Sequence, residues 1–203
     1  MSGTQAAPPV FEPHFNPEIV LRAYCQGIFP MGNDDGTIDW YSPDPRCIID
    51  FAQFHASKRL LRTCRQGIYD IRVNGCFEDV MWACADRDTT WITEKIVAVY
   101  SYLNQHGLAH SVEAYDQKGA LVGGLYGVAI GGAFMGESMF HRATDASKVC
   151  LVFLIERLKE RGFVLLDSQY VNKHLASFNA QNIPRAEYLA RLNYALTLKC
   201  RFD

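Results

Sequence analysis

Two carboxylates stand among apolar residues in the second half of the chain. Glu137 lies within one apolar segment, and Asp167 follows another, with Gln169 and Asn172 close behind it. A carboxylate in apolar surroundings must be paired with a cation, hydrogen-bonded or shifted in pKa. Either one could be purely structural, satisfied by an arginine such as Arg142. Taken together, the two carboxylates and two amides predict a site that handles an amine or an ester.

The segment before Glu137 is rich in glycine, with six glycines in the 14 residues from Gly123 to Gly136. Glycine weakens strands, so this density indicates either a twisted hairpin packed under a helix or a ligand lying against the backbone. The spacing matches neither the dinucleotide-binding pattern nor the P-loop, which argues against a nucleotide-phosphate site. Ser138 and His141 lie three residues apart on an expected strand, hence on opposite faces, which argues against a Ser-His-Asp triad.

A basic helix face and a tryptophan are candidates for contacts with a nucleic acid. Lys58, Arg62 and Arg65 follow helical spacing, and Arg59 adds a fourth positive charge. Such a face is either solvated or turned towards phosphates. Trp91 precedes another expected helix, where it would pack in the core or stack on a base.

The composition limits the classes of protein to which this chain can belong. The 203 residues include 20 Lys and Arg against 22 Asp and Glu, so a protein that binds nucleic acid through its overall charge is excluded. No apolar run has the length of a membrane helix, and the N-terminus lacks the pattern of a signal peptide, so we expect a cytoplasmic protein. The seven cysteines and six histidines are scattered, which predicts reduced thiols and no metal site.

The elements that must position these residues can be read from periodicity and from turn residues. We expect an irregular arm over residues 1–15 and a loop over 28–36. The expected helices cover residues 17–26, 55–66, 77–85, 93–106 and 146–161, with two more beginning near 172 and 184. The expected strands cover residues 37–41, 47–51, 69–74, 111–115, 120–130, 133–140 and 163–166, with Asp167 at the end of the last and Asp145 capping the helix before it. This order predicts an α+β fold, a mainly antiparallel mixed sheet with helices on its faces.

Eight segments occur in an order that resembles one known family. They are Ala23–Tyr24 with Gly27–Pro30, Trp40–Arg46, Thr90–Thr93, Ala109–Glu113, Leu121–Lys148, Leu166–Gln169, His174–Ser177 and Ile183–Arg185. The chain resembles the leucyl/phenylalanyl-tRNA–protein transferases from about Asn16 to Leu192. The resemblance implies an acyl-CoA N-acyltransferase-like catalytic domain over residues 45–203, behind a small N-terminal α/β domain over residues 1–44.

The resemblance also implies the reaction and its participants. The protein would transfer Leu, Phe or also Met from aminoacyl-tRNA to the α-amine of proteins that begin with Arg or Lys, marking them for degradation through the N-degron pathway. It would need neither a cofactor nor a metal, because the aminoacyl ester is already activated. A monomer would be favoured.

The resemblance also assigns the roles of the family's site residues to the matching residues of this chain. Asp167 and Gln169, with Glu137 and Asn172 nearby, would form the polar catalytic centre, in which Asp167 orders Gln169 and helps the amine to lose its proton. Trp91 and Met31 would contact the tRNA 3′ end, and the basic helix face would contact phosphates. The aminoacyl side chain would occupy a pocket formed by Leu125, Phe134, Gly136, Met139, Leu154 and Leu166.

The chain departs from the family pattern at a few positions, and two other functions remain open. Met31 replaces a Trp that contacts the tRNA end, Tyr41 replaces a second Trp, and Ser168 replaces a Cys. One alternative is an acyl-CoA-dependent N-acyltransferase, although Asp145 would then stand where a pyrophosphate binds. The other is a non-catalytic tRNA-binding or degradation adaptor, which the presence of the polar centre disfavours.

Overall fold

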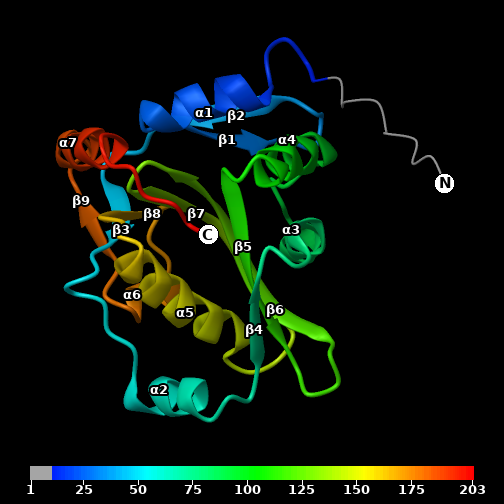
Figure 1. Cartoon of the computed structure of the whole chain (residues 1–203). Helices are drawn as coiled ribbons and strands as arrows, with labels where there is room; N and C mark the ends of the chain where they lie inside the picture. Colours follow the sequence, from blue (N-terminus) through cyan, green and yellow to red (C-terminus); the bar gives the residue numbers. More distant parts are fainter. Residues whose placement is uncertain (1–10) are drawn as a thin grey trace.

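A seven-stranded mixed sheet runs through the protein, with helices on both faces (Figure 1). The computed structural model describes residues 11–203, so residues 1–10 of the expected irregular arm lie outside the described part. In this part the helices are α1 (Pro17–Cys25), α2 (Lys58–Arg65), α3 (Phe77–Ala85), α4 (Glu94–Gln105), α5 (Ala146–Glu160), α6 (Lys173–Ala176) and α7 (Arg185–Leu196). Its strands are β1 (Phe29–Gly32), β2 (Ile38–Tyr41), β3 (Arg46–Ile49), β4 (Asp70–Val73), β5 (Ala109–Tyr115), β6 (Leu121–Ile130), β7 (Ala133–His141), β8 (Leu165–Gln169) and β9 (Gln181–Ile183).

The order of strands in the main sheet is β4-β5-β6-β7-β8-β3-β9. All neighbouring pairs are antiparallel except β7 and β8, which are parallel. Strands β1 and β2 form a separate two-stranded antiparallel sheet beside α1. The prediction of an α+β fold with a mixed, mainly antiparallel sheet is confirmed.

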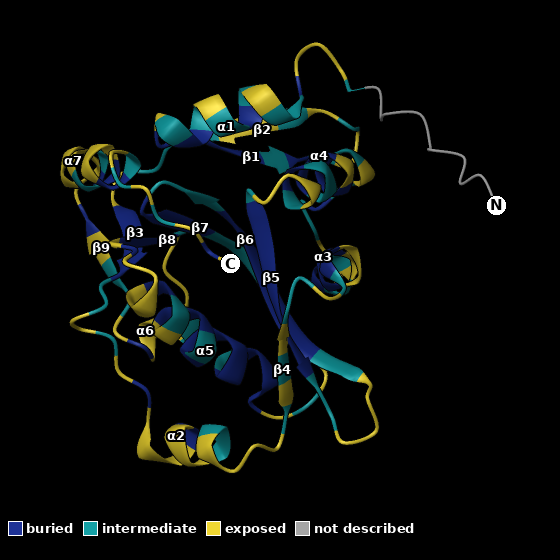
Figure 2. Cartoon of the chain, viewed as in Figure 1, coloured by how far each residue is buried: buried dark blue, intermediate teal, exposed yellow. Residues whose placement is uncertain are grey.

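Alternation along the strands divides the apolar side chains between two cores, one on each face of the sheet. On β6, Leu125 belongs to the core under α5, whereas Tyr126 belongs to the core under α3 and α4. Phe134 and Met135 on β7 divide in the same way. In Figure 2 the buried strand β5 runs between α5, which is mostly buried, and helices α3 and α4, whose outer sides are exposed.

The parallel strands β7 and β8 separate soon after they meet. They pair only where Ala133–Met135 faces Leu165–Asp167; β7 then continues alone on this side while β8 pairs with β3. On its other side β7 carries a β-bulge, because Tyr126 faces Ser138 and the next residue of β6 faces Gly136, two residues away. Glu137 is the extra residue, and a bulge turns such a side chain out of the regular alternation.

The glycine-rich segment owes its composition to close packing of this hairpin. A Cβ atom on Gly127 would lie 2.3 Å from the carbonyl oxygen of Met135, and one on Gly123 would lie 2.5 Å from the Cβ of Ala146 at the start of α5. Both distances are shorter than a side chain can tolerate. These two glycines therefore support the alternative in which the hairpin packs tightly under a helix.

Two expectations about the strands were wrong, and one strand was missed. The loop predicted over residues 28–36 contains strand β1, which pairs with β2 and tolerates Pro30 because the sheet has only two strands. Asp167 lies inside β8 opposite Ile48, since that strand continues to Gln169. The short strand β9, which pairs with β3, was not predicted because its three residues show no alternation of their own.

Asp145 occupies the N-cap position of α5 but does not cap the helix. Its φ is 63°, in the left-handed region, and its side chain makes no capping hydrogen bond. The carboxylate instead forms ion pairs with Arg59 on α2 and with Lys148 on α5. Competition from two cations explains why the sequence pattern of a capped helix start was misleading here.

Over residues 11–203, no helix has both the length and the apolar composition required to cross a membrane.

Candidate active site

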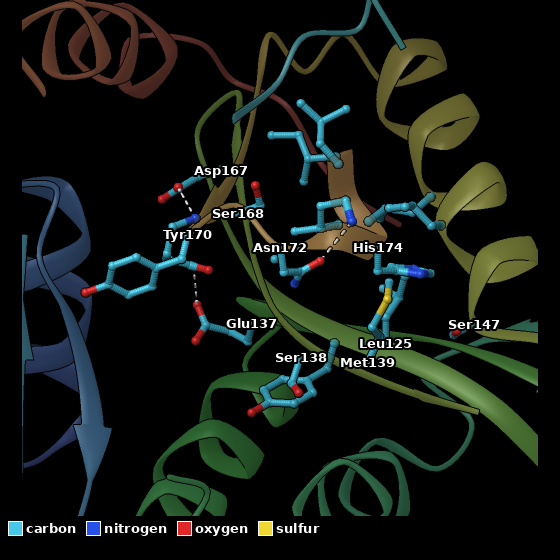
Figure 3. A pocket seen from close by; sticks show the side chains of 18 of the residues that line it. Leu125, Glu137, Ser138, Met139, Ser147, Asp167, Ser168, Tyr170, Asn172 and His174 are labelled. Atoms are coloured by element: carbon cyan, nitrogen blue, oxygen red, sulfur yellow. Dashed lines mark hydrogen bonds between the residues drawn. The ribbon is translucent and has the colours of Figure 1, made fainter. Parts of the chain in front are cut away.

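A cavity of about 470 Å³ lies where β7 and β8 separate, bounded by α5, by α6 and by the chain before α4. Apolar side chains form one part of its wall, and polar groups from β7 and β8 form another (Figure 3). The apolar part contains Leu125, Gly136, Met139, Leu154 and Leu166. The separation of two strands thus produces a space that is apolar on one side and polar on the other.

Asp167 is a fully buried carboxylate on the polar side. The guanidinium of Arg46 donates to both of its oxygens, Nε at 2.9 Å and Nη2 at 2.6 Å. The Tyr188 hydroxyl and the backbone N–H of Gln169 also donate to it, each at 2.9 Å. Four hydrogen bonds, two of them from the charged guanidinium of Arg46, fix the position of Asp167, so it serves as an anchor for its neighbours.

Arg46 is itself buried, which requires that every part of its charge be compensated. Besides Asp167, its Nη1 group donates to the carbonyl oxygen of Gly27 at 3.0 Å. The rings of Phe29 and Tyr188 lie against its guanidinium, with centroids 4.8 and 4.5 Å away. The arginine expected as a partner, Arg142, instead packs over the ring of Phe140.

Gln169 connects the anchor to the cavity. Its φ of 56° lies in the left-handed region, which costs about 1–2 kcal/mol in a residue other than glycine. The hydrogen bond from its N–H to Asp167 helps to offset that strain. Its side-chain Nε2 then donates to Oε1 of Glu137 at 3.2 Å, so the polar residues form a chain from Asp167 to Glu137.

Glu137 carries the carboxyl group with the most altered acidity in the cavity. Burial raises its pKa to about 8, and the negative charge of Asp167 adds to the rise, whereas a hydrogen bond from Tyr24 and the charge of Arg46 oppose it. The Tyr24 hydroxyl donates to Oε1 at 2.7 Å and is hydrogen-bonded in turn to the hydroxyl of Tyr100. A carboxyl with this pKa can accept and release a proton near neutral pH.

Comparison with known proteins assigns this arrangement to a family. The family model described as leucyl/phenylalanyl-tRNA protein transferase matches residues 48–193, and the model of that family's N-terminal domain matches residues 14–44. The chain belongs to this family. Curated members named leucyl/phenylalanyl-tRNA–protein transferase come from Rubrobacter xylanophilus (52% identity over 92% of this chain and 97% of the relative) and Gloeobacter violaceus (53% over 92% and 96%).

Two solved structures show distant similarity to this member of the transferase family. The structure of L-PGS from Bacillus licheniformis gives a TM-score of 0.40 at 13% identity, covering 79% of this chain and 55% of the other. The C-terminal domain of a putative lysylphosphatidylglycerol synthetase from Agrobacterium fabrum gives 0.41 at 12% identity, covering 92% and 63%. The fold description therefore rests on this chain's own topology.

The structure brings most of the residues expected at the transferase site to one cavity. Glu137, Asp167, Gln169 and Asn172 line it, as do Met31, Trp91 and the five apolar residues named above. Phe134 does not line it: its side chain is fully buried, with its ring stacked 5.4 Å from that of Phe202. Gly136, two residues further along β7, lines the cavity but has no side chain to extend into it.

Two other expected groups have contacts of their own. Asn172 is exposed at the cavity. Its side-chain oxygen Oδ1 accepts a hydrogen bond from the N–H of Leu175 at 2.8 Å and so caps α6. The α2 patch, defined as Lys58, Arg59, Arg62 and Arg65, lies on one exposed helix, and no residue of that helix lines the cavity. Arg59 pairs with Asp145, whereas the other three form no ion pair with the described residues.

Several residues of the transferase site were not assigned from the sequence. Arg46 carries one detectable signal, a charged residue at the start of a strand whose four residues are all buried. Tyr24 and Tyr188 lie on amphipathic helices, where a buried tyrosine looks like any core residue. Only the fold shows that both hydroxyls reach the carboxylates.

Proposed function

We propose that this chain transfers leucine or phenylalanine from aminoacyl-tRNA to the α-amine of a protein. One observation carries the proposal: a single cavity combines an apolar wall with Glu137, a carboxyl whose pKa is about 8. The wall suits an apolar aminoacyl side chain, and the carboxyl suits an amine nucleophile. Family membership and the names of relatives about half identical in sequence support the same reaction.

The apolar wall also limits how sharply donors are distinguished. A hydrophobic pocket separates side chains that differ by about one methylene by only about 1–3 kcal/mol. We therefore infer that methionine is accepted as well, more weakly than leucine, while charged side chains are rejected. The exclusion of Phe134 from the wall leaves four side chains to shape this preference: Leu125, Met139, Leu154 and Leu166.

Glu137 is proposed to take the proton of the acceptor amine. An α-amine titrates near about 7.7–8.0, and the pKa of Glu137 is about 8, so the transfer between them is nearly balanced in free energy. The neutral nitrogen attacks the ester carbonyl carbon and the C–N bond forms. As the bond to the ribose oxygen breaks, Glu137 passes its proton to that oxygen, and it then takes the second proton lost by the nitrogen, which leaves to solvent as the neutral amide forms. No covalent enzyme intermediate is required, because the ester is already activated.

Asp167 and Gln169 are proposed to hold other groups of the site in place. All the hydrogen-bonding capacity of Asp167 is taken by Arg46, Tyr188 and Gln169, so its contribution is to fix the backbone of Gln169. The Gln169 amide in turn orients the carboxyl of Glu137. Asn172, whose Oδ1 caps α6, keeps an amide N–H₂ group for a carbonyl of the acceptor.

The tRNA is proposed to contact two separate regions. Trp91 and Met31, at the cavity, receive the terminal adenosine, and Met31 offers weaker stacking than an aromatic residue. The α2 patch contacts phosphates further along the tRNA. Because three of its four charges lack an acidic partner among the described residues, this contact is expected to be strongly salt-dependent.

Several further features belong to the same proposal. The acceptors are proteins that begin with Arg or Lys, and the modification marks them for N-degron proteolysis, as the motif resemblance suggests. The transferase itself acts in the cytoplasm as a monomer. The chain is divided into residues 1–44 and residues 45–203, and the two family models, which adjoin near this boundary, support the division. The second part is acyl-CoA N-acyltransferase-like; the separation of β7 and β8, which makes room for an acyl group, supports that description.

The test is incubation with Leu-tRNA or Phe-tRNA and a peptide that begins with Arg or Lys, followed by mass spectrometry. The expected result is a mass gain of one leucyl or phenylalanyl residue, with none for an N-acetylated peptide or with an acyl-CoA donor. Glu137→Gln should lower the rate at least tenfold, whereas Glu187→Gln on the exposed face of α7 should leave it unchanged. Transfer from acyl-CoA alone, or tRNA binding without transfer, would assign the chain to one of the two alternatives.

A second pair of variants tests the positioning role. Asp167→Asn keeps the size of the side chain but removes its charge, and it should lower the transfer rate together with the alignment of Gln169. Asp167→Ala with a rate near that of the wild type would refute the assignment. Circular dichroism on each variant separates loss of the site from loss of the fold.

A further inference from the structure

Arg87 is an exposed arginine whose side chain is nevertheless held in place at the cavity. Its Nε donates to the carbonyl oxygen of Cys84 on α3 at 2.6 Å, and its Nη2 donates to Oγ of Ser138 on β7 at 2.7 Å. The side chain lines the same cavity as Met31 and Trp91. Two fixed nitrogens define the plane of the guanidinium, so its remaining N–H groups have a defined direction.

The positive charge of Arg87 is not neutralised by the described residues. No carboxylate of residues 11–203 lies within ion-pair distance of it, although Asp86 and Asp88 flank it in sequence. Its Nη1 group has no hydrogen-bond partner among these residues either. Arg46 differs in this respect, because its positive charge is neutralised by Asp167. A preoriented guanidinium with free donors is suited to bind an oxyanion with two hydrogen bonds.

The position of Arg87 indicates which oxyanion it meets. Its partner Ser138 is adjacent to Glu137, the proposed proton acceptor, and Trp91 lies on the wall of the same cavity. A donor with its aminoacyl group on the apolar wall and its ester beside Glu137 directs its terminal nucleoside towards Trp91 and Arg87. We propose that Arg87 binds the phosphodiester on the 5′ side of that nucleoside.

This inference rests on the proposed function, and it adds a subsite to it. The α2 patch would supply diffuse attraction for the tRNA, whereas Arg87 would make one directed contact beside the reaction. The contact would fix the distance between phosphate and ester and so place the carbonyl carbon near the amine. Arg87 is therefore a positioning residue for the donor.

Binding measurements test the subsite without requiring catalysis. Tryptophan fluorescence would be titrated with adenosine and with the dinucleotide CpA, which contains one phosphodiester. The wild type should bind CpA at least tenfold more tightly than adenosine, and Arg87→Ala should remove most of that difference. The control Arg142→Ala, an arginine that packs over Phe140 away from the cavity, should keep it.

Kinetics with matched donors provide the second readout. With Arg87→Ala the KM for Leu-tRNA and for leucyl-CpA should rise about 10- to 100-fold, while transfer from leucyl-adenosine changes less than about threefold. An equal loss with all three donors would show that Arg87 only supports Ser138 and Cys84, and would overturn the inference. A rise confined to the KM of the acceptor peptide would also overturn it, assigning Arg87 to an acidic group of the acceptor. Failure of the wild type to use any leucyl donor would instead refute the proposed function.

Discussion

Replacing Glu137 by Gln should change how the stability of the protein depends on pH. In the unfolded chain this carboxyl ionises near its ordinary pKa of 4.5, whereas in the folded protein burial raises the pKa to about 8. Between these values the unfolded state releases a proton that the folded state retains. The stabilisation from Glu137 is therefore complete below about pH 4.5 and is lost as the pH rises towards 8.

The size of this change in stability follows from the difference between the two pKa values of Glu137. One unit of pKa difference corresponds to about 1.4 kcal/mol, so raising the pH from 5 to 8 should cost the wild type up to about 4 kcal/mol from this group. The amide introduced by Glu137→Gln stays neutral and can still accept the hydrogen bond from Tyr24. The variant should consequently lack this part of the decline and gain stability relative to the wild type with rising pH.

Urea unfolding followed by tryptophan fluorescence at pH 5, 6, 7 and 8 measures both curves. All other titrating groups are common to the two proteins, so the difference between the curves isolates Glu137. Glu187→Gln, which removes an exposed partner of Arg191 on α7, serves as the control and should run parallel to the wild type. If Glu137→Gln also runs parallel, the carboxyl is ionised throughout, and the argument that it exchanges a proton with an amine is refuted.

Three other outcomes follow from the same contacts. Tyr24→Phe removes a hydrogen bond that favours the ionised carboxylate, so the midpoint of the pH–rate profile should move upward by about one unit. Arg46→Met leaves the buried Asp167 without its cation and should lower the free energy of unfolding by about 3–5 kcal/mol in urea titrations. Replacing the α2 patch by glutamines should weaken tRNA binding about tenfold or more at low salt and flatten its salt dependence in filter-binding assays, with transfer from leucyl-adenosine unchanged.

Each of these outcomes has a result that contradicts it. Tyr115→Phe, a tyrosine hydrogen-bonded to Cys76 instead of to the site, should not move the pH profile; an equal shift in both would point to a general effect. An Arg46→Met protein as stable as the wild type would mean that the buried ion pair with Asp167 does not contribute to stability. A salt slope that stays the same after the patch is neutralised would place the phosphate contacts on another surface.

The sequence predicted what depends on local periodicity. The helix over residues 77–85 was placed correctly because its apolar residues follow a helical period, and strands β6 and β7 were placed on either side of a pair of glycines. Contacts between distant positions were not predictable in this way. Arg46 and Asp167 are separated by 121 positions, and nothing local indicates that they meet.

Two residues show a further limit of prediction from the sequence. Strand alternation assigns Glu137 to a face of the sheet only if the pairing is regular, and the bulge at this residue cannot be seen without its partner strand. Phe134 lies two residues before Gly136 of the cavity wall, but its ring packs against Phe202 near the C-terminus. Both outcomes depend on three-dimensional pairing that one sequence does not specify.

The contacts of Arg46 also constrain when the reacting centre can form during synthesis. Its partners are Gly27, Asp167 and Tyr188, so the ion pair joins the first helix region, two strands of the main sheet and the last helix. A growing chain can complete this cluster only after residue 188 has left the ribosome, although aminoacyl-tRNA is abundant around it from the start. A nascent chain would thus be inert towards those tRNAs; transfer activity in a fragment that ends before α7 would contradict this.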